Sequence, residues 1–165
     1  MAILTTPAPA VRVTPAWYVL GGGLLVGTID IVYACVFWAL KAGVPARRIL
    51  QSVSAGLLGT ASFDGGTATA ALGLALHFFN AVTMSVVYYL ASGRLPALAR
   101  RPVLWGGLYG LGIYAVMNYV VIPLSAARPG SRDPLWVGLS IAVHVFLIGM
   151  PIAFATRLAR RAGES

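Results

Sequence analysis

Four strongly polar side chains interrupt long apolar runs, and they are the residues of this chain that could do chemistry. They are Asp30, His77, Asn118 and His144. Asn80 follows His77 by three residues, which puts the two side chains on one face of a helix. A carboxylate and two imidazoles could handle protons, or could bind a transition metal or a haem iron, because histidine titrates near neutrality and ligates both.

Elements long enough to cross a membrane must position these side chains. Hydrophobic residues make up 59% of the 165 residues and charged residues only 10%, whereas soluble domains have about 45–50% and about 25%. So few charges cannot cover a globular surface, and the apolar runs repeatedly exceed the roughly 18 residues that cross hydrocarbon. The sequence therefore predicts an all-α membrane protein, with four transmembrane helices in an up-down bundle at residues 17–40, 67–91, 103–124 and 135–156.

The chain is expected to form one transmembrane domain with two short tails. The domain covers residues 17–157, after a flexible Pro-rich N-terminal tail (1–16) and before a basic C-terminal tail (158–165). Between the first two spans, Pro45 and the apolar spacing after it indicate a short interfacial helix, and a re-entrant turn before Asp64 remains an alternative. All four tryptophans fall near predicted span ends, where amphipathic rings prefer to lie: Trp17, Trp38, Trp105 and Trp136.

The strongly polar residues fall at similar depths in their spans. Each lies about 12 to 15 residues from the end of its span, so their heights differ by roughly 4.5 Å. An ionised aspartate at this depth costs about 2.5–3.5 kcal/mol, so Asp30 should face the interior and either find a partner or remain protonated. His77 and His144 are the expected partners. We call Asp30, His77, Asn80, Asn118 and His144 the polar layer and expect it to face inward.

Several functions are compatible with such a layer. The leading expectation is a structural or accessory membrane protein, whose polar side chains join helices by hydrogen bonds. Proton or small-solute handling is an alternative, and so is binding of haem b or a transition metal through His77 and His144, with Asp30 as a further metal ligand. An enzyme is not predicted, because the sequence contains no nucleophile elbow, phosphate loop or dinucleotide fingerprint.

Two pairs of glycines have the spacing that lets membrane helices approach closely. They are Gly23 with Gly27 and Gly106 with Gly110. Glycine faces of this kind could pack the spans within one bundle, or could join the chain to a second copy or a membrane partner.

The basic charge of the chain points to lipid headgroups and not to nucleic acid. The net charge is +8, but the charges lie between apolar runs and form no basic face. With four spans, one side of the membrane carries Arg12, Arg94, Arg100, Arg101, Arg157, Arg160 and Arg161. The other side carries Lys41, Arg47, Arg48, Arg128 and Arg132. The positive-inside rule therefore predicts that both termini are cytoplasmic.

The C-terminal third carries a family resemblance. A glycine-rich span start (Gly106, Gly107, Gly110), the segment 121–124 (Val-Ile-Pro-Leu) and His144 in the last span resemble the uncharacterised YagU-like bacterial inner-membrane proteins. The resemblance implies four helices and a location in the bacterial inner (cytoplasmic) membrane. It implies no activity, cofactor or site residue.

Overall fold

The computed structural model describes residues 14–164, and this part of the chain is helical, without strands. Four stretches are long and apolar enough to cross a membrane, at Pro15–Ala42, Gly66–Arg94, Pro102–Leu124 and Pro134–Glu164. This confirms the predicted all-α fold with four transmembrane helices. The fourth helix continues to Glu164, beyond the predicted end of its span at residue 156.

The first two spans are single helices, whereas the last two contain wide turns. Helix α1 covers Pro15–Ala42 and α3 covers Gly66–Arg94. The third span joins α5 (Pro102–Val116), the π-helical η2 (Met117–Val121) and α6 (Ile122–Leu124). The fourth joins α7 (Pro134–Ala142), the π-helical η3 (Val143–Gly149) and α8 (Met150–Glu164). The short α4 (Ala97–Arg100) links α3 to α5.

Prolines and glycines set the ends of these helices. Pro15, Pro102 and Pro134 start α1, α5 and α7, where the missing N–H costs nothing. Helix α1 ends at Gly43, whose φ of 64° is left-handed and whose N–H donates to the carbonyl of Ala39. A glycine without a Cβ adopts this conformation at no steric cost.

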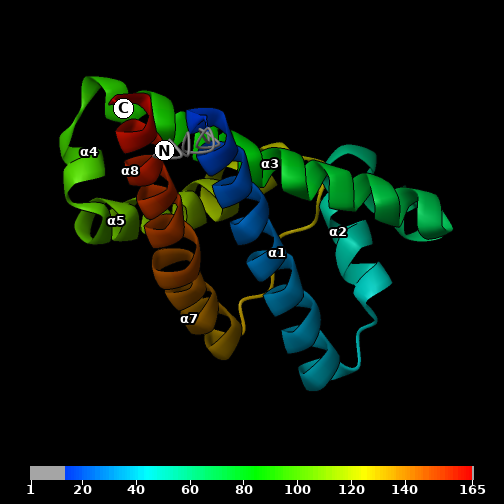
Figure 1. Cartoon of the computed structure of the whole chain (residues 1–165). Helices are drawn as coiled ribbons and strands as arrows, with labels where there is room; N and C mark the ends of the chain where they lie inside the picture. Colours follow the sequence, from blue (N-terminus) through cyan, green and yellow to red (C-terminus); the bar gives the residue numbers. More distant parts are fainter. Residues whose placement is uncertain (1–13, 165) are drawn as a thin grey trace, which may run out of the picture.

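The spans run alternately up and down, so both ends of the described chain lie at one end of the bundle (Figure 1). The start of α1 approaches the end of α8, where a Cβ on Gly163 would lie 3.5 Å from Pro15. Helices α1 and α3 are antiparallel, and the Ser85 hydroxyl near the end of α3 donates to the Val19 carbonyl near the start of α1 at 2.8 Å. Tyr109 of α5 donates to the Met84 carbonyl of α3, also at 2.8 Å.

Glycines allow the closest helix approaches inside the bundle. A Cβ on Gly23 would lie 2.7 Å from Val82 Cα, and a Cβ on Gly27 would lie 2.9 Å from the Phe78 ring, both on α3. On α5, a Cβ on Gly110 would lie only 1.9 Å from the carbonyl oxygen of His144. Both predicted glycine faces are therefore covered within the chain itself. They are not free to join a second copy or a membrane partner.

A short amphipathic helix, α2 (Ala46–Leu58), lies between the first two spans, as predicted. It packs along the first part of α3, where a Cβ on Gly73 would lie 1.9 Å from the Leu50 carbonyl. Its buried residues include the polar Gln51 and Ser54, while its exposed residues include both Arg48 and Leu57. This mixture suits a helix that lies at the boundary between polar and apolar surroundings. A 3₁₀ segment, η1 (Gly59–Asp64), connects α2 to α3.

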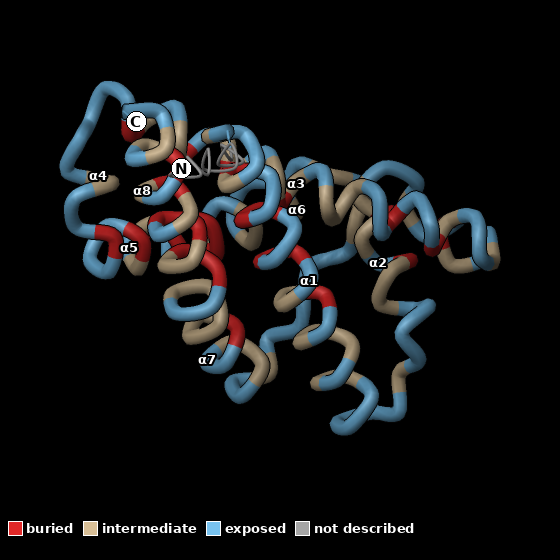
Figure 2. The backbone as a smooth tube through the Cα atoms, viewed as in Figure 1, coloured by how far each residue is buried: buried red, intermediate tan, exposed pale blue. Residues whose placement is uncertain are grey.

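The outer surface of the bundle is apolar, as lipid contact requires. Figure 2 shows exposed residues along every span, with buried stretches where α8 packs against α1 and α5. Exposed side chains include Leu24, Leu25, Phe79, Leu108 and Phe146. Because water does not tolerate so many exposed apolar groups, the chain is a multi-pass membrane protein. Most of the predicted N-terminal tail, 1–16, lies outside the described residues.

Candidate functional site

The polar layer lines a single cavity of about 260 Å³ between the spans. All five members contribute to its wall: Asp30 from α1, His77 and Asn80 from α3, Asn118 from η2 and His144 from η3. Each of the four spans therefore supplies at least one polar side chain. Apolar neighbours such as Val26, Ile113 and Ile148 form much of the remaining wall.

His77 is held by a hydrogen bond between helices. Its Nε2 lies 2.8 Å from the carbonyl oxygen of Gly27. A carbonyl can only accept, so Nε2 carries the proton and Nδ1 of the neutral ring keeps its lone pair. The absence of a side chain at Gly27 lets α1 approach α3 closely enough for this contact. This member of the layer does join two spans.

Asn118 and His144 lie in the two π-helical segments. In each span the π segment ends two residues before a proline: Val121 precedes Pro123, and Gly149 precedes Pro151. Because a proline ring clashes with the carbonyl four residues before it and cannot donate to it, the preceding turn widens. The prolines thus give a local reason for the wide turns that carry these two side chains.

Asn118 and His144 bond within their own helices. Asn118 Nδ2 donates to the Tyr114 carbonyl at 2.9 Å, and His144 Nδ1 donates to the Ser140 carbonyl at 2.8 Å. The Asn118 Oδ1 atom and the His144 Nε2 lone pair therefore receive no hydrogen bond from another described residue. Their hydrogen bonds do not join helices, unlike that of His77, although the His144 ring packs edge-on against Tyr114 of α5.

The carboxylate of Asp30 lies in the cavity wall. Within residues 14–164, no N–H or O–H donates to it and no cation pairs with it. Both histidines line the same cavity, but neither is bonded to Asp30. The expected pairing of Asp30 with a histidine is therefore wrong. An unpaired carboxylate inside a bilayer is costly, so it favours a positively charged partner in the cavity.

A cluster of aromatic rings lies at one side of the cavity. Tyr33 of α1 and Trp136 of α7 both line it, and their rings stack with centroids 5.3 Å apart and planes 4° apart. The Tyr33 hydroxyl lies 3.2 Å from the Ser140 hydroxyl. Trp136 also contacts Phe37 and Trp38, at centroid distances of 5.0 and 5.3 Å. We call Tyr33, Phe37, Trp38 and Trp136 the aromatic wall.

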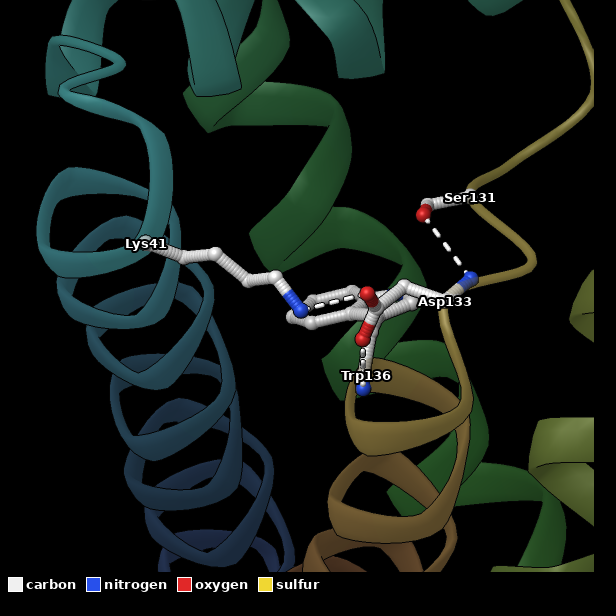
Figure 3. Close-up of polar contacts among 4 residues, drawn as sticks. All are labelled: Lys41, Ser131, Asp133 and Trp136. Carbon is white, nitrogen blue, oxygen red and sulfur yellow. Dashed lines mark hydrogen bonds and ion pairs between the residues drawn. The ribbon is translucent and has the colours of Figure 1, made fainter.

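An ion pair joins the ends of α1 and α7 next to the aromatic wall. Figure 3 shows Lys41 reaching across to Asp133, the residue that caps α7. The second carboxylate oxygen of Asp133 accepts the backbone N–H of Trp136 at 3.0 Å. The hydrogen bond from Lys41, with that from Trp136, lowers the pKa of the Asp133 carboxyl. This contact ties the aromatic wall to the loop before α7.

The geometry does not favour the metal and haem hypotheses. No group of three or more His, Cys, Asp or Glu side chains within residues 14–164 is placed to hold a metal ion. A porphyrin is larger than most drug-sized ligands, whose pockets measure about 300–1,000 Å³, and the cavity measures about 260 Å³. In addition, His77 Nε2 is already bonded to Gly27. A smaller ligand suits this cavity better.

Sequence reasoning missed some of the residues that complete the cavity. Ser140 precedes His144 by one helical turn, so helical spacing could have identified it. Trp136 was expected only as an interface anchor, yet it lines the cavity. Val53 of α2 also lines the cavity, and no sequence pattern indicates that contact.

Comparison with protein-family models, with curated proteins and with solved structures finds no match for this chain. The geometry of the cavity is therefore the basis for assigning a function.

Proposed function

We propose that this protein binds a small polar solute in the cavity between its spans. One observation carries the proposal: polar side chains from all four spans line one cavity and keep unpaired polar atoms there. The Asp30 carboxylate and the second ring nitrogen of His144 are such atoms. Residues that only joined helices would form hydrogen bonds from one helix to another. In the polar layer, His77 alone forms such a bond, to the Gly27 carbonyl.

A structural or accessory role is the second candidate, and the bond between His77 and Gly27 favours it. The two candidates differ in what they require of the cavity. Solute binding needs the cavity volume, whereas a structural role is unaffected or improved when the volume is filled.

The experiment measures the thermal unfolding of purified protein in detergent with three probes of similar size. These are propylammonium chloride, propionamide and sodium propionate, in phosphate buffer because Tris is itself a protonated amine. A probe that binds the folded state raises the apparent Tm in proportion to its saturation. Ala34→Leu fills the cavity, whereas Ala39→Leu is the matched control on the exposed face of the same helix.

We expect at least one probe to raise the Tm of the wild type and of Ala39→Leu, but not of Ala34→Leu. If no probe does so, or if both variants respond equally, solute binding in the cavity is refuted and the structural role is left.

We propose further that the protein lies in a bacterial inner membrane with both termini in the cytoplasm. Support comes from the YagU-like resemblance and from the basic residues at the end shared by α3, α5 and α8, among them Arg94, Arg101 and Arg161. A reporter that fluoresces only in the cytoplasm, fused after Ser165, should be bright. If instead a phosphatase that is active only in the periplasm were active when fused at that position, the proposed orientation would be wrong.

A further inference from the structure

The unpaired atoms of the cavity include several acceptors without a matching donor. His144 donates its Nδ1 proton to the Ser140 carbonyl, so the neutral ring presents a bare Nε2. His77 donates its Nε2 proton to the Gly27 carbonyl, so its Nδ1 is bare. The tautomer of each imidazole is fixed by a backbone carbonyl. Neither ring, while neutral, has an N–H left for a ligand.

Asn118 and Asp30 add further acceptors, whereas the Asn80 amide in the cavity wall brings both donors and an acceptor. Asn118 donates to the Tyr114 carbonyl and keeps its Oδ1 as an acceptor. Asp30 brings two carboxylate oxygens that accept nothing from the described part of the chain. A ligand that satisfied these atoms would itself have to be rich in N–H or O–H donors.

The charge of the cavity wall also favours a cation over an anion. Its described wall contains one carboxylate, from Asp30, and no Lys or Arg. The nearby Lys41 is already paired with Asp133. An anion would meet a carboxylate and bare acceptor atoms without a compensating cation, which is unfavourable in apolar surroundings. A cation would meet the opposite charge.

The aromatic rings in the cavity wall favour a cation that also has an apolar part. Tyr33 and Trp136 lie in the cavity wall and stack on one another. The faces of such rings attract ammonium and guanidinium groups, with Trp the strongest. The apolar residues of the wall would cover a short alkyl chain. A bare inorganic ion would not use either feature.

Resting on the proposed solute binding, we infer that the ligand is a small organic ammonium ion. Its N–H groups donate to Asp30 and to the bare imidazole nitrogens, and its carbon atoms lie against Tyr33, Trp136 and the apolar residues of the cavity wall. The cavity of about 260 Å³ lies just below the range of drug-sized pockets, about 300–1,000 Å³, which favours a ligand smaller than a typical drug.

The test compares the same three probes with one another and adds an Asp30→Asn variant. Asp30→Asn keeps the size of the side chain but removes its charge, and Asp64→Asn is the matched control at an exposed aspartate outside the cavity. Sodium chloride at the same ionic strength controls for salt. We expect propylammonium to raise the Tm of the wild type and of Asp64→Asn. In Asp30→Asn we expect its apparent affinity to fall at least tenfold.

The outcomes separate this inference from the proposed function. If propionamide or propionate raises the Tm through the cavity and propylammonium does not, solute binding stands and the ammonium class is wrong. If sodium chloride stabilises as well as propylammonium, the effect is ionic and the inference is overturned. If no probe acts, both proposals fail. The comparison of probes on the wild type decides the question even if Asp30→Asn does not fold.

Discussion

The close contact of α5 with η3 makes a strong prediction for Gly110→Ala. An added Cβ would lie 1.9 Å from the carbonyl oxygen of His144 and 3.0 Å from Val145 Cα. Both are backbone atoms, so no rotation of a side chain relieves the clash. The two helices must move apart by at least about 1 Å, in an interior packed as densely as a crystal. Overpacking of this kind costs about 1–3 kcal/mol, and more where backbone has to move.

The measurement is the free energy of unfolding in mixed micelles of mild detergent and dodecyl sulfate. Gly112→Ala is the matched control, because a Cβ there meets nothing within 4 Å. The control should unfold like the wild type or slightly later, since alanine favours helix. Gly149→Ala should be as damaging as Gly110→Ala, because its Cβ would lie 2.1 Å from the Gly106 carbonyl oxygen.

The double variant Gly110→Ala with Gly149→Ala should lose less than the sum of the two single losses, because either substitution already separates the same helices. If Gly110→Ala and Gly112→Ala were equally stable, the close approach of α5 and η3 would be wrong. The placement of His144 in the cavity would then be wrong with it.

Three further perturbations test individual contacts, each by unfolding in detergent. His77→Ala should lose about 0.6 kcal/mol, the average for a hydrogen bond between membrane helices, because its bond to α1 disappears. Asp133→Asn keeps an α7 cap but loses the ion pair with Lys41, so it should be less stable than the wild type at pH 7. Because the ion pair lowers the pKa of Asp133 below its ordinary 3.8, this difference should shrink as the pH falls below 3.8. Arg160→Lys should destabilise the bundle, because a lysine cannot reproduce the forked contacts of Arg160, and Arg161→Lys should not.

Each of these three predictions has a result that would contradict it. His77→Ala as stable as the wild type would mean that the bond to Gly27 contributes nothing. A pH-independent difference for Asp133→Asn would show that the ion pair is not what stabilises the end of α7. Equal losses in Arg160→Lys and Arg161→Lys would show that the contact of Arg160 with Ser92 is unimportant.

The four spans were predictable because length and apolarity are properties of the sequence alone. An apolar run that crosses hydrocarbon must be a helix, since its backbone has no other hydrogen-bond partners there. The similar depth of Asp30, His77, Asn118 and His144 followed from counting residues along those helices. The structure places all four in the wall of one cavity.

The pairing of side chains was not predictable in the same way. Contacts across helices depend on how each helix is rotated about its axis, and counting residues gives only depth. Asp30 was expected to find a histidine, whereas His77 and His144 both bond to backbone carbonyls. The burial of the polar Gln51 and Ser54 of α2 also depends on packing against α3 that sequence spacing does not contain.

The two π segments determine where the fold can tolerate the deletion of a single residue. An i→i+5 turn holds one residue more than an α-helical turn, and one residue corresponds to about 100° of rotation. A single deletion within α8 or α5 would turn every later side chain of that span away from its neighbours. A single deletion within residues 117–121 or 143–149 would instead convert the wide turn to an ordinary one, leaving the flanking faces aligned. The bundle could survive such a loss, but Asn118 or His144 would be carried away from the cavity.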